Sequence, residues 1–187
     1  MKKVLYHGSG KAFGEFVIDK ALARSSEKDL TQGYGIYMSE DYEFCKSYGN
    51  NVYTTSVDEK NIFDTLSKKA VRSIIKKVEK MVDVHILNNI DLDTIFKKIS
   101  SGEITVNDLY VELNDILESN EKFYFEHENL FTDDDDCLTK RIEEAYKMVI
   151  PDVIKFHNKF LGMDMYVCVK NEENLKIENI DTEKRAS

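Results

Sequence analysis

Apolar and polar positions follow two different periods along the chain. Short stretches rich in β-branched, aromatic or aliphatic residues, bounded by glycine or polar runs, predict strands at Val4–Tyr6, Gly35–Ser39, Asn51–Val57 and Met163–Val169. Between the second and third of these, Glu40–Tyr48 has the composition of a helix. The two ends of the chain therefore supply the predicted strands.

The middle of the chain has a helical period instead. Apolar residues recur at spacings of three and four from Leu66 to Val82, which predicts an amphipathic helix. Capping residues and stop signals predict further helices over Asp91–Ile99, Thr105–Leu117, Cys137–Val149 and Pro151–Leu161, and a short one within Asp19–Asp29. Two shorter features complete the pattern: a loop over Gly8–Gly14, and a turn at Glu172 and Glu173 before an extended Leu175–Ile177.

These elements predict an α+β chain that forms a single domain over residues 1–187. Residues 66–161 form a mostly helical insertion or lid on a small split antiparallel sheet. A length of 187 residues and 42% hydrophobic content suit one packed core. The tail from Asp181 to Ser187 is polar and is expected to fray.

Composition narrows the cellular setting. We find no apolar run long enough for a membrane span and no leader peptide, so we expect a cytoplasmic protein without a membrane partner. Three cysteines without a Cys-x-x-Cys pair indicate neither a disulfide framework nor a metal site. The net charge of −9 falls mostly after residue 62, which disfavours broad nucleic-acid binding.

The residues that suggest a binding site lie in or next to the predicted strands. His7-Gly8-Ser9 follows the first strand, Gly35-Ile36-Tyr37 forms the second, and Tyr48 comes eleven residues after Tyr37. Two tyrosines can sandwich an aromatic ring, a histidine can fix ribose hydroxyls, and a glycine lets a ligand reach the backbone. The set predicts a nicotinamide-dinucleotide pocket.

In this order and spacing the residues resemble the His-Tyr-acid class of ADP-ribosyltransferases, which includes diphtheria toxin and the poly(ADP-ribose) polymerases. The resemblance implies an ADP-ribosyltransferase-like split-sheet core with NAD as substrate, and it covers about the first 65 and the last 25 residues. It implies that His7 and Gly8 contact the ribose and carboxamide and that Tyr37 and Tyr48 stack on the nicotinamide. Cys45 stands where polymerases of the class carry a serine, and Ser47 could take that role after a small shift. The remaining expected contacts with NAD are Ser9 on the adenosine ribose, Arg24 over the adenine or pyrophosphate, Gly35 and Ile36.

The same resemblance assigns the catalytic acid, which the class places at the start of a late strand. Asp164 has that position and joins His7 and Tyr37 as the predicted catalytic set. An aspartate is one methylene shorter than the usual glutamate, so either the backbone lies closer to the ribose or the activity is weak or absent. Glu172 and Glu173 are the second choice.

Each of these residues also has an ordinary structural explanation. Tyr37 and Tyr48 can be core aromatics, and Asp164 can cap a turn. The cations of the first long helix, and the acidic run Asp133–Asp136, are typical of solvated surfaces. We assign no chemistry to the three histidines after His7, which are His85, His127 and His157.

The sequence thus predicts a mono-ADP-ribosyltransferase that moves ADP-ribose from NAD to an unidentified macromolecule, a protein rather than a nucleic acid, and releases nicotinamide. The alternatives are a NAD glycohydrolase and an inactive nucleotide- or partner-binding module of the same fold. By analogy with the family, such a chain suits a phage or bacterial effector or a toxin with a cognate inhibitor or antitoxin.

Overall fold

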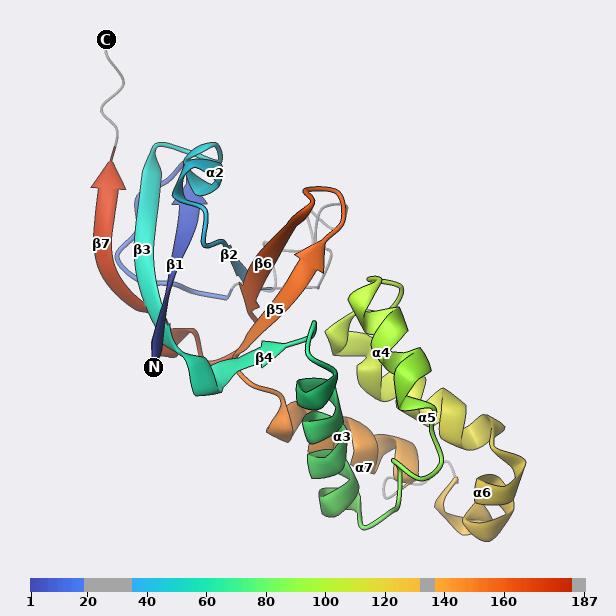
Figure 1. Cartoon of the computed structure of the whole chain (residues 1–187). Coiled ribbons are helices and arrows are strands. Elements are labelled where there is room, and N and C mark those ends of the chain that lie inside the picture. Colours follow the sequence, from blue (N-terminus) through green and yellow to red (C-terminus); the bar gives the residue numbers. More distant parts are fainter. Residues whose placement is uncertain (19–34, 132–136, 183–187) are drawn as a thin grey trace. The chain divides into compact units, whose positions relative to one another are not determined.

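The computed structural model describes residues 1–18, 35–131 and 137–182 (Figure 1). These residues divide into two compact units, a sheet unit (Met1–Phe63 with Pro151–Ser187) and a helical unit (Asp64–Ile150). The chain is of the α+β class, with strands in one unit and most of the helices in the other.

The sheet unit contains two small antiparallel sheets. The first has the strand order β1-β3-β7, and the second has the order β2-β6-β5-β4. Their bounds are β1 (Lys2–Ser9), β2 (Ile36–Met38), β3 (Asn51–Asp58), β4 (Ile62–Asp64), β5 (Val153–Asn158), β6 (Met163–Cys168) and β7 (Lys176–Thr182). Within the described residues an isolated bridge joins the sheets: Tyr6 N–H donates to the Ser39 carbonyl over 2.7 Å, and Ser39 N–H donates to the Tyr6 carbonyl over 2.9 Å.

One apolar cluster fills this unit and draws side chains from both sheets. Leu5 and Tyr53 of the first sheet and Met38 of the second are fully buried in it. Two short helical elements complete the unit near the ends of strands: α2 (Tyr42–Lys46) and the 3-10 turn η5 (Glu172–Asn174), with a further 3-10 turn, η2 (Glu59–Asn61), between β3 and β4. The core fixes β1, β2 and β6, the three strands that carry the candidate site.

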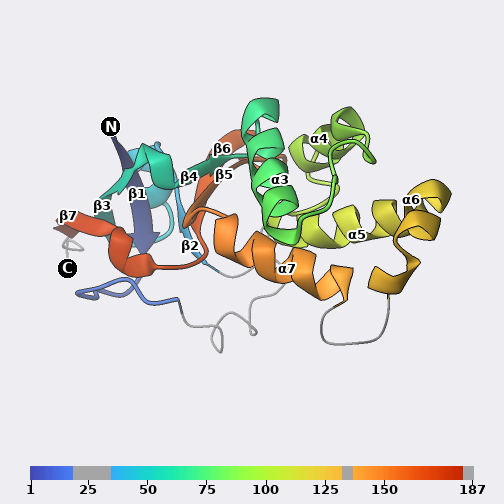
Figure 2. The same ribbon diagram turned by 90° about the horizontal axis from the view of Figure 1, so that it is seen from below.

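The helical unit buries one apolar face of each long helix. Its helices are α3 (Lys68–Val82), α4 (Leu92–Ser100), α5 (Leu109–Ser119), α6 (Glu121–Glu126) and α7 (Leu138–Val149), with 3-10 turns η3 (Val106–Asp108) and η4 (Glu128–Leu130). Helix α3 packs along α7, and α5 packs against α6 and α7 (Figure 2). None of the helices among the described residues is long and apolar enough to cross a membrane.

Most of the predicted elements are confirmed. The four strand predictions correspond to β1, β2, β3 and β6, and the predicted caps Asp91 and Thr105 start α4 and η3 with side-chain hydrogen bonds to the helix backbone. The apolar positions of the first long helix, from Val71 to Val82, are buried as the periodicity predicts. The short helix expected within Asp19–Asp29 lies outside the described residues.

The predicted helix over Pro151–Leu161 is wrong, because this segment contains strand β5. Pro151 and Gly162 look like the start and stop of a helix, but Val153, Ile154 and Phe156 are β-branched or aromatic and bury themselves by pairing with β6. Gly162 has a φ of 65° and turns the chain between β5 and β6 rather than ending a helix.

Three smaller differences concern the ends of elements. Gly8 and Ser9 belong to β1 and not to a loop, because β1 pairs with β3 through Ser9. Helix α6 was not predicted, since its six residues are too few to show a helical period. Strand β7 includes Asp181 and Thr182, the first residues of the segment expected to fray.

Candidate functional site

His7 lies on β1 with one ring nitrogen already engaged. Its Nδ1 is 2.8 Å from the carbonyl oxygen of Tyr37, and three aromatic rings, those of Phe13, Phe16 and Tyr53, surround the imidazole at centroid distances of 5.5 to 6.1 Å. Burial lowers the pKa of His7 and outweighs the raising effect of its bond to Tyr37. The ring is therefore neutral at pH 7, with its proton on Nδ1 and with Nε2 as an acceptor for a hydroxyl group.

Gly8 brings β1 and α2 into direct backbone contact. A Cβ at this position would collide with the carbonyl oxygen of Cys45, lie 2.7 Å from its carbonyl carbon and come within 3.1 Å of Tyr48 Cβ. Only glycine allows this approach. The reason for a glycine here is thus the packing of α2 against β1, and that packing fixes Tyr48 beside the His7-Gly8 segment.

The two predicted stacking tyrosines differ in exposure. Tyr37 is partly buried on β2, with its ring edge-on to Phe156 at 6.2 Å. Tyr48 follows α2 and is 58% exposed, with its ring edge-on to Phe44 at 5.1 Å. An aromatic ring this exposed and held at one edge has a face to offer a ligand.

Cys45 and Ser47, the two candidates for a carboxamide contact, have partners within the protein. The Cys45 thiol donates to the Tyr6 carbonyl over 3.1 Å, and burial raises its pKa to about 11. The Ser47 hydroxyl is at the exposed end of α2 and donates to the Phe44 carbonyl over 2.6 Å. Of the two, the Ser47 hydroxyl is the one at the surface.

Four other residues were predicted to contact NAD: Ser9, Arg24, Gly35 and Ile36. Ser9 Oγ accepts from Lys11 N–H over 3.2 Å, and Ile36 points into the core. A Cβ at Gly35 would collide with the Cys168 carbonyl oxygen, so this glycine too is required by strand packing. Arg24 lies outside the described residues.

Asp164, the predicted acid, is held by two neighbours on β5. Its Oδ1 is 3.0 Å from His157 Nδ1, and its Oδ2 is 3.1 Å from Lys155 Nζ. Partial burial tends to raise the pKa of Asp164, but the hydrogen bonds and charges of His157 and Lys155 together hold it below the ordinary value. Asp164 is ionised at neutral pH and 39% exposed, so it offers a fixed negative charge and not a proton.

The register of the second sheet places Tyr37 and Asp164 on opposite faces. Tyr37 pairs with Val167, whereas Asp164 pairs with His157 and lies three residues away along β6. The pairing of β2 with β6 ends at Tyr166, so beyond it Asp164 has no partner on β2. In the described residues the His7 ring bonds the Tyr37 backbone, and Gly8 contacts the segment that carries Tyr48 from the other face of β1. Asp164 lies past the end of the pairing of β2 with β6.

Glu40, which follows β2, joins Lys3 and Tyr166 in a second polar group. The Tyr166 hydroxyl donates to Glu40, which also pairs with Lys3 of β1 at 2.6 Å. The hydrogen bonds from Lys3 and Tyr166 lower the pKa of Glu40. These contacts link β1, the end of β2 and β6 next to the bridge between the sheets.

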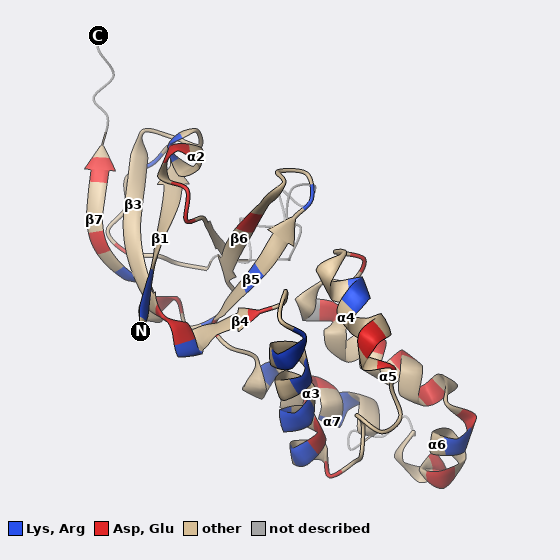
Figure 3. Cartoon of the chain, in the orientation of Figure 1, with Lys and Arg blue, Asp and Glu red and all other residues tan. Residues whose placement is uncertain are grey.

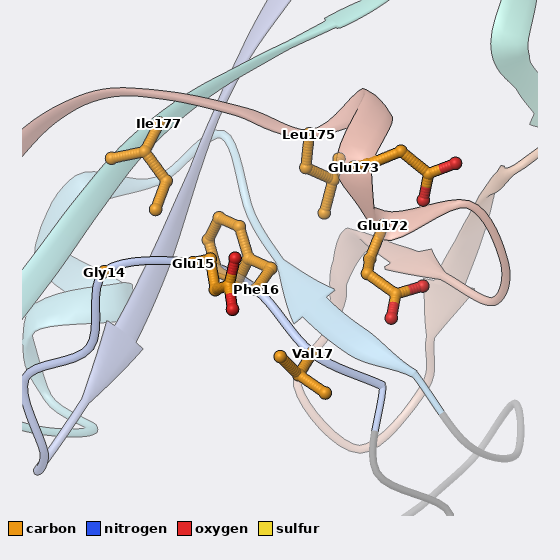
Figure 4. Close-up of a pocket in the computed structure, with 8 residues that line it drawn as sticks. All are labelled: Gly14, Glu15, Phe16, Val17, Glu172, Glu173, Leu175 and Ile177. Atoms are coloured by element: carbon orange, nitrogen blue, oxygen red, sulfur yellow. The ribbon is translucent and has the colours of Figure 1, made fainter.

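Glu172 and Glu173, the second-choice acids, border a pocket of about 590 Å³ (Figure 4). Its other walls are Leu175 and Ile177 and the segment after β1 that includes Phe16. Glu172 accepts the Ile18 N–H over 3.2 Å, so it has a structural role. The acidic lining makes this pocket unsuitable for the pyrophosphate of a dinucleotide.

Lys and Arg recur along α3 (Figure 3), and their side chains are exposed, as the sequence indicated. Six of them are exposed: Lys68, Lys69, Arg72, Lys76, Lys77 and Lys80. Lys68 forms an ion pair with Asp93, the first acidic residue of α4. Within the described part of the chain, no group of three or more metal-ligating side chains is placed to hold a metal ion.

Sequence reasoning missed Lys155 and His157, because it assigned their segment to a helix. A signal was present in the sequence: Ile154 and Phe156 alternate with Lys155 and His157, which is the period of a strand with one polar face. Read with that period, the segment would have placed both polar side chains on one face of a strand.

Comparisons with known proteins give only distant likenesses. No protein-family model matches the chain. The sequence is 24% identical over 150 residues to "Dynein heavy chain-like protein 2" of Plasmodium falciparum (isolate 3D7), an alignment that covers 72% of this chain but 3% of that protein. A solved structure titled "Crystal structure of an anti-CRISPR protein" aligns over 98% of this chain and 96% of that chain, with 10% identity and a TM-score of 0.43. Neither comparison bears on ADP-ribosyl transfer.

Proposed function

We propose that this protein is a mono-ADP-ribosyltransferase that uses NAD as its substrate. The observation that supports the proposal is the contact of Gly8 with α2, which holds the exposed Tyr48 against β1 one residue from His7. The contacts that support it are one backbone approach, of Gly8 to the segment that carries Tyr48, and one hydrogen bond, of the His7 ring to the Tyr37 carbonyl. Asp164 lies past the end of β2, as described above.

The nature of the groups fits NAD. Tyr48 offers an exposed aromatic face for the nicotinamide ring. Tyr37, on β2, is the second ring that we propose to flank the nicotinamide. The neutral His7 offers Nε2 to a ribose hydroxyl, which is a donor. Because the ribose is one bond from the nicotinamide ring, the ring must lie at the end of β2, where the pairing with β6 stops two residues before Asp164.

The reaction follows from these positions. The bond between C1 of the ribose and the nicotinamide nitrogen breaks, and its electron pair neutralises the positive charge of the pyridinium ring. The ribose becomes oxocarbenium-like, and the ionised Asp164 stabilises that positive charge. A nucleophile of the acceptor then forms the new bond to C1 and loses its proton.

One observation favours a second candidate, a nucleotide-binding module without turnover. Both oxygens of Asp164 are engaged, and Lys155 already neutralises part of its charge. A carboxylate in this state stabilises an oxocarbenium less than a bare one does. This candidate predicts NAD binding with no release of nicotinamide.

The test uses NAD labelled in its adenylate phosphate, with the full-length protein and a bacterial lysate. We expect free nicotinamide together with label on macromolecules. Tyr48→Ala should reduce both, whereas Phe125→Ala, which removes an aromatic ring that is 71% exposed in the helical unit, should reduce neither. Nicotinamide release without labelled macromolecules would identify a glycohydrolase, and binding without release would identify the binding module.

A further inference from the structure

The hairpin of β5 and β6 holds an Asp-His pair that the sequence did not reveal. His157 and Asp164 are partners in the strand register, and the imidazole Nδ1 is 3.0 Å from Asp164 Oδ1. A carboxylate only accepts, so Nδ1 carries the proton of this hydrogen bond. In the neutral ring Nε2 is then the acceptor. His157 is 40% exposed at its side chain, so other molecules can reach the ring.

Lys155 completes the arrangement on the other side of the carboxylate. Its Nζ is 3.1 Å from Asp164 Oδ2, so the two carboxylate oxygens have one cationic and one imidazole partner. These contacts favour the ionised form of the carboxylate. A proton that arrives at Nε2 therefore stays on the imidazole, and the carboxylate stabilises the resulting cation, as the aspartate of a catalytic triad does for its histidine.

We propose that His157 is the general base of the transfer reaction, with Asp164 as the residue that orients it. This inference rests on the proposed ADP-ribosyl transfer and adds a second role to Asp164. A lone pair of the acceptor, or of water, forms the bond to C1 of the ribose while the bond to nicotinamide breaks and its electrons pass to the ring nitrogen. The proton of the attacking group passes to His157 Nε2 and is later lost to solvent.

This role explains why a carboxylate in the acid position is paired with an imidazole. A carboxylate whose two oxygens are engaged is a poor base, because each partner stabilises its ionised form. The neighbouring imidazole has an acceptor nitrogen, Nε2, at an exposed side chain and is the group of this pair that suits the removal of a proton. In this proposal Asp164 supplies the negative charge that stabilises the oxocarbenium, and His157 accepts the proton of the attacking group.

The test is chemical rescue with full-length protein, NAD and bacterial lysate, with the rate of nicotinamide release as readout. We expect His157→Ala to lower the rate by about 10² or more, the usual range for loss of a general base. Because the ring is partly exposed, added imidazole should enter the space and restore at least several-fold of the lost rate. His157→Gln can still donate to Asp164 but cannot take a proton, so it should be folded, inactive and not rescued.

The matched control is His85→Ala, which removes an exposed histidine of the helical unit. Its rate should equal that of the wild type, with and without imidazole. Two results overturn the inference while the proposed function stands: a rate for His157→Ala within twofold of wild type, or a loss that imidazole does not restore although NAD affinity is unchanged. Absence of nicotinamide release from the wild type overturns both the proposed function and this inference.

Discussion

Gly8→Ala tests the contact on which the candidate site depends. In the structure the Cα of Gly8 faces the backbone of α2, and a methyl group there would lie 2.7 Å from the carbonyl carbon of Cys45 and closer still to its oxygen. The obstacle is backbone, not the end of a flexible side chain. Relief requires β1 and α2 to separate by at least about 1.5 Å, because heavy atoms pack at about 3.5 to 4 Å.

The cost of this separation can be bounded. Overpacking of a well-packed contact costs about 1 to 3 kcal/mol. The movement also lengthens the 3.1 Å hydrogen bond from the Cys45 thiol to the Tyr6 carbonyl and displaces Tyr48, whose Cβ would be 3.1 Å from the added methyl group. A displaced Tyr48 would lose the stacking on nicotinamide that we propose for it, about 0.5 to 1.5 kcal/mol, which is a roughly two- to tenfold weaker affinity for NAD.

Two measurements check this prediction: urea denaturation for the free energy of unfolding, and calorimetric titration for NAD affinity. Gly10→Ala is the matched control, because a Cβ at Gly10 has no atom within 4 Å, and it should change neither quantity. If Gly8→Ala is as stable as Gly10→Ala and binds NAD as tightly as the wild type, then β1 and α2 do not approach as described and the geometry of the site is wrong.

Three further predictions concern the individual units. Burial lowers the pKa of His7, so the unfolded chain binds a proton at a higher pH than the folded protein does. The free energy of unfolding should therefore fall as the pH drops below the ordinary histidine value of about 6.5. Urea denaturation between about pH 7 and 5 should show a smaller fall for His7→Gln than for the wild type. Asn114→Leu should raise the free energy of unfolding by about 1 to 2 kcal/mol, since both polar atoms of this buried amide lack partners among the described residues; a less stable variant would show that the amide is satisfied. Asp152→Ala should lower it by about 3 kcal/mol, because the buried carboxylate accepts from Asn171 Nδ2 and Asn174 Nδ2 at 2.7 Å each, and an unchanged urea midpoint would contradict this.

The sequence was informative wherever local patterns decide local structure. The helical period from Leu66 to Val82, and the caps at Asp91 and Thr105, depend on neighbours three or four residues away, so they could be predicted and are confirmed. Strand β5 could not be separated from a helix in this way. Its state is decided by pairing with β6, and Pro151 and Gly162 supplied local signals that favoured a helix.

The candidate site shows the same division. Spacing along the chain selected His7, Tyr37 and Tyr48. It carried no information on which groups hydrogen-bond to one another or pack together. That the Cys45 thiol turns to the Tyr6 carbonyl, and that Gly8 is required by α2, depends on contacts between segments 37 to 39 residues apart. The partners of Asp164 on β5 were hidden for the same reason, since they follow from a pairing that the sequence pattern misassigned.

The most direct test of the central claim is the release of nicotinamide from NAD by the purified protein, measured beside Asp164→Ala. The substitution removes a side chain that is 39% exposed, so the fold should survive it. Release by the wild type that falls at least a hundredfold in Asp164→Ala is the predicted result. Equal release by both proteins would remove Asp164 from the chemistry, and no release by the wild type, with or without lysate, would contradict the assignment of a NAD-consuming enzyme.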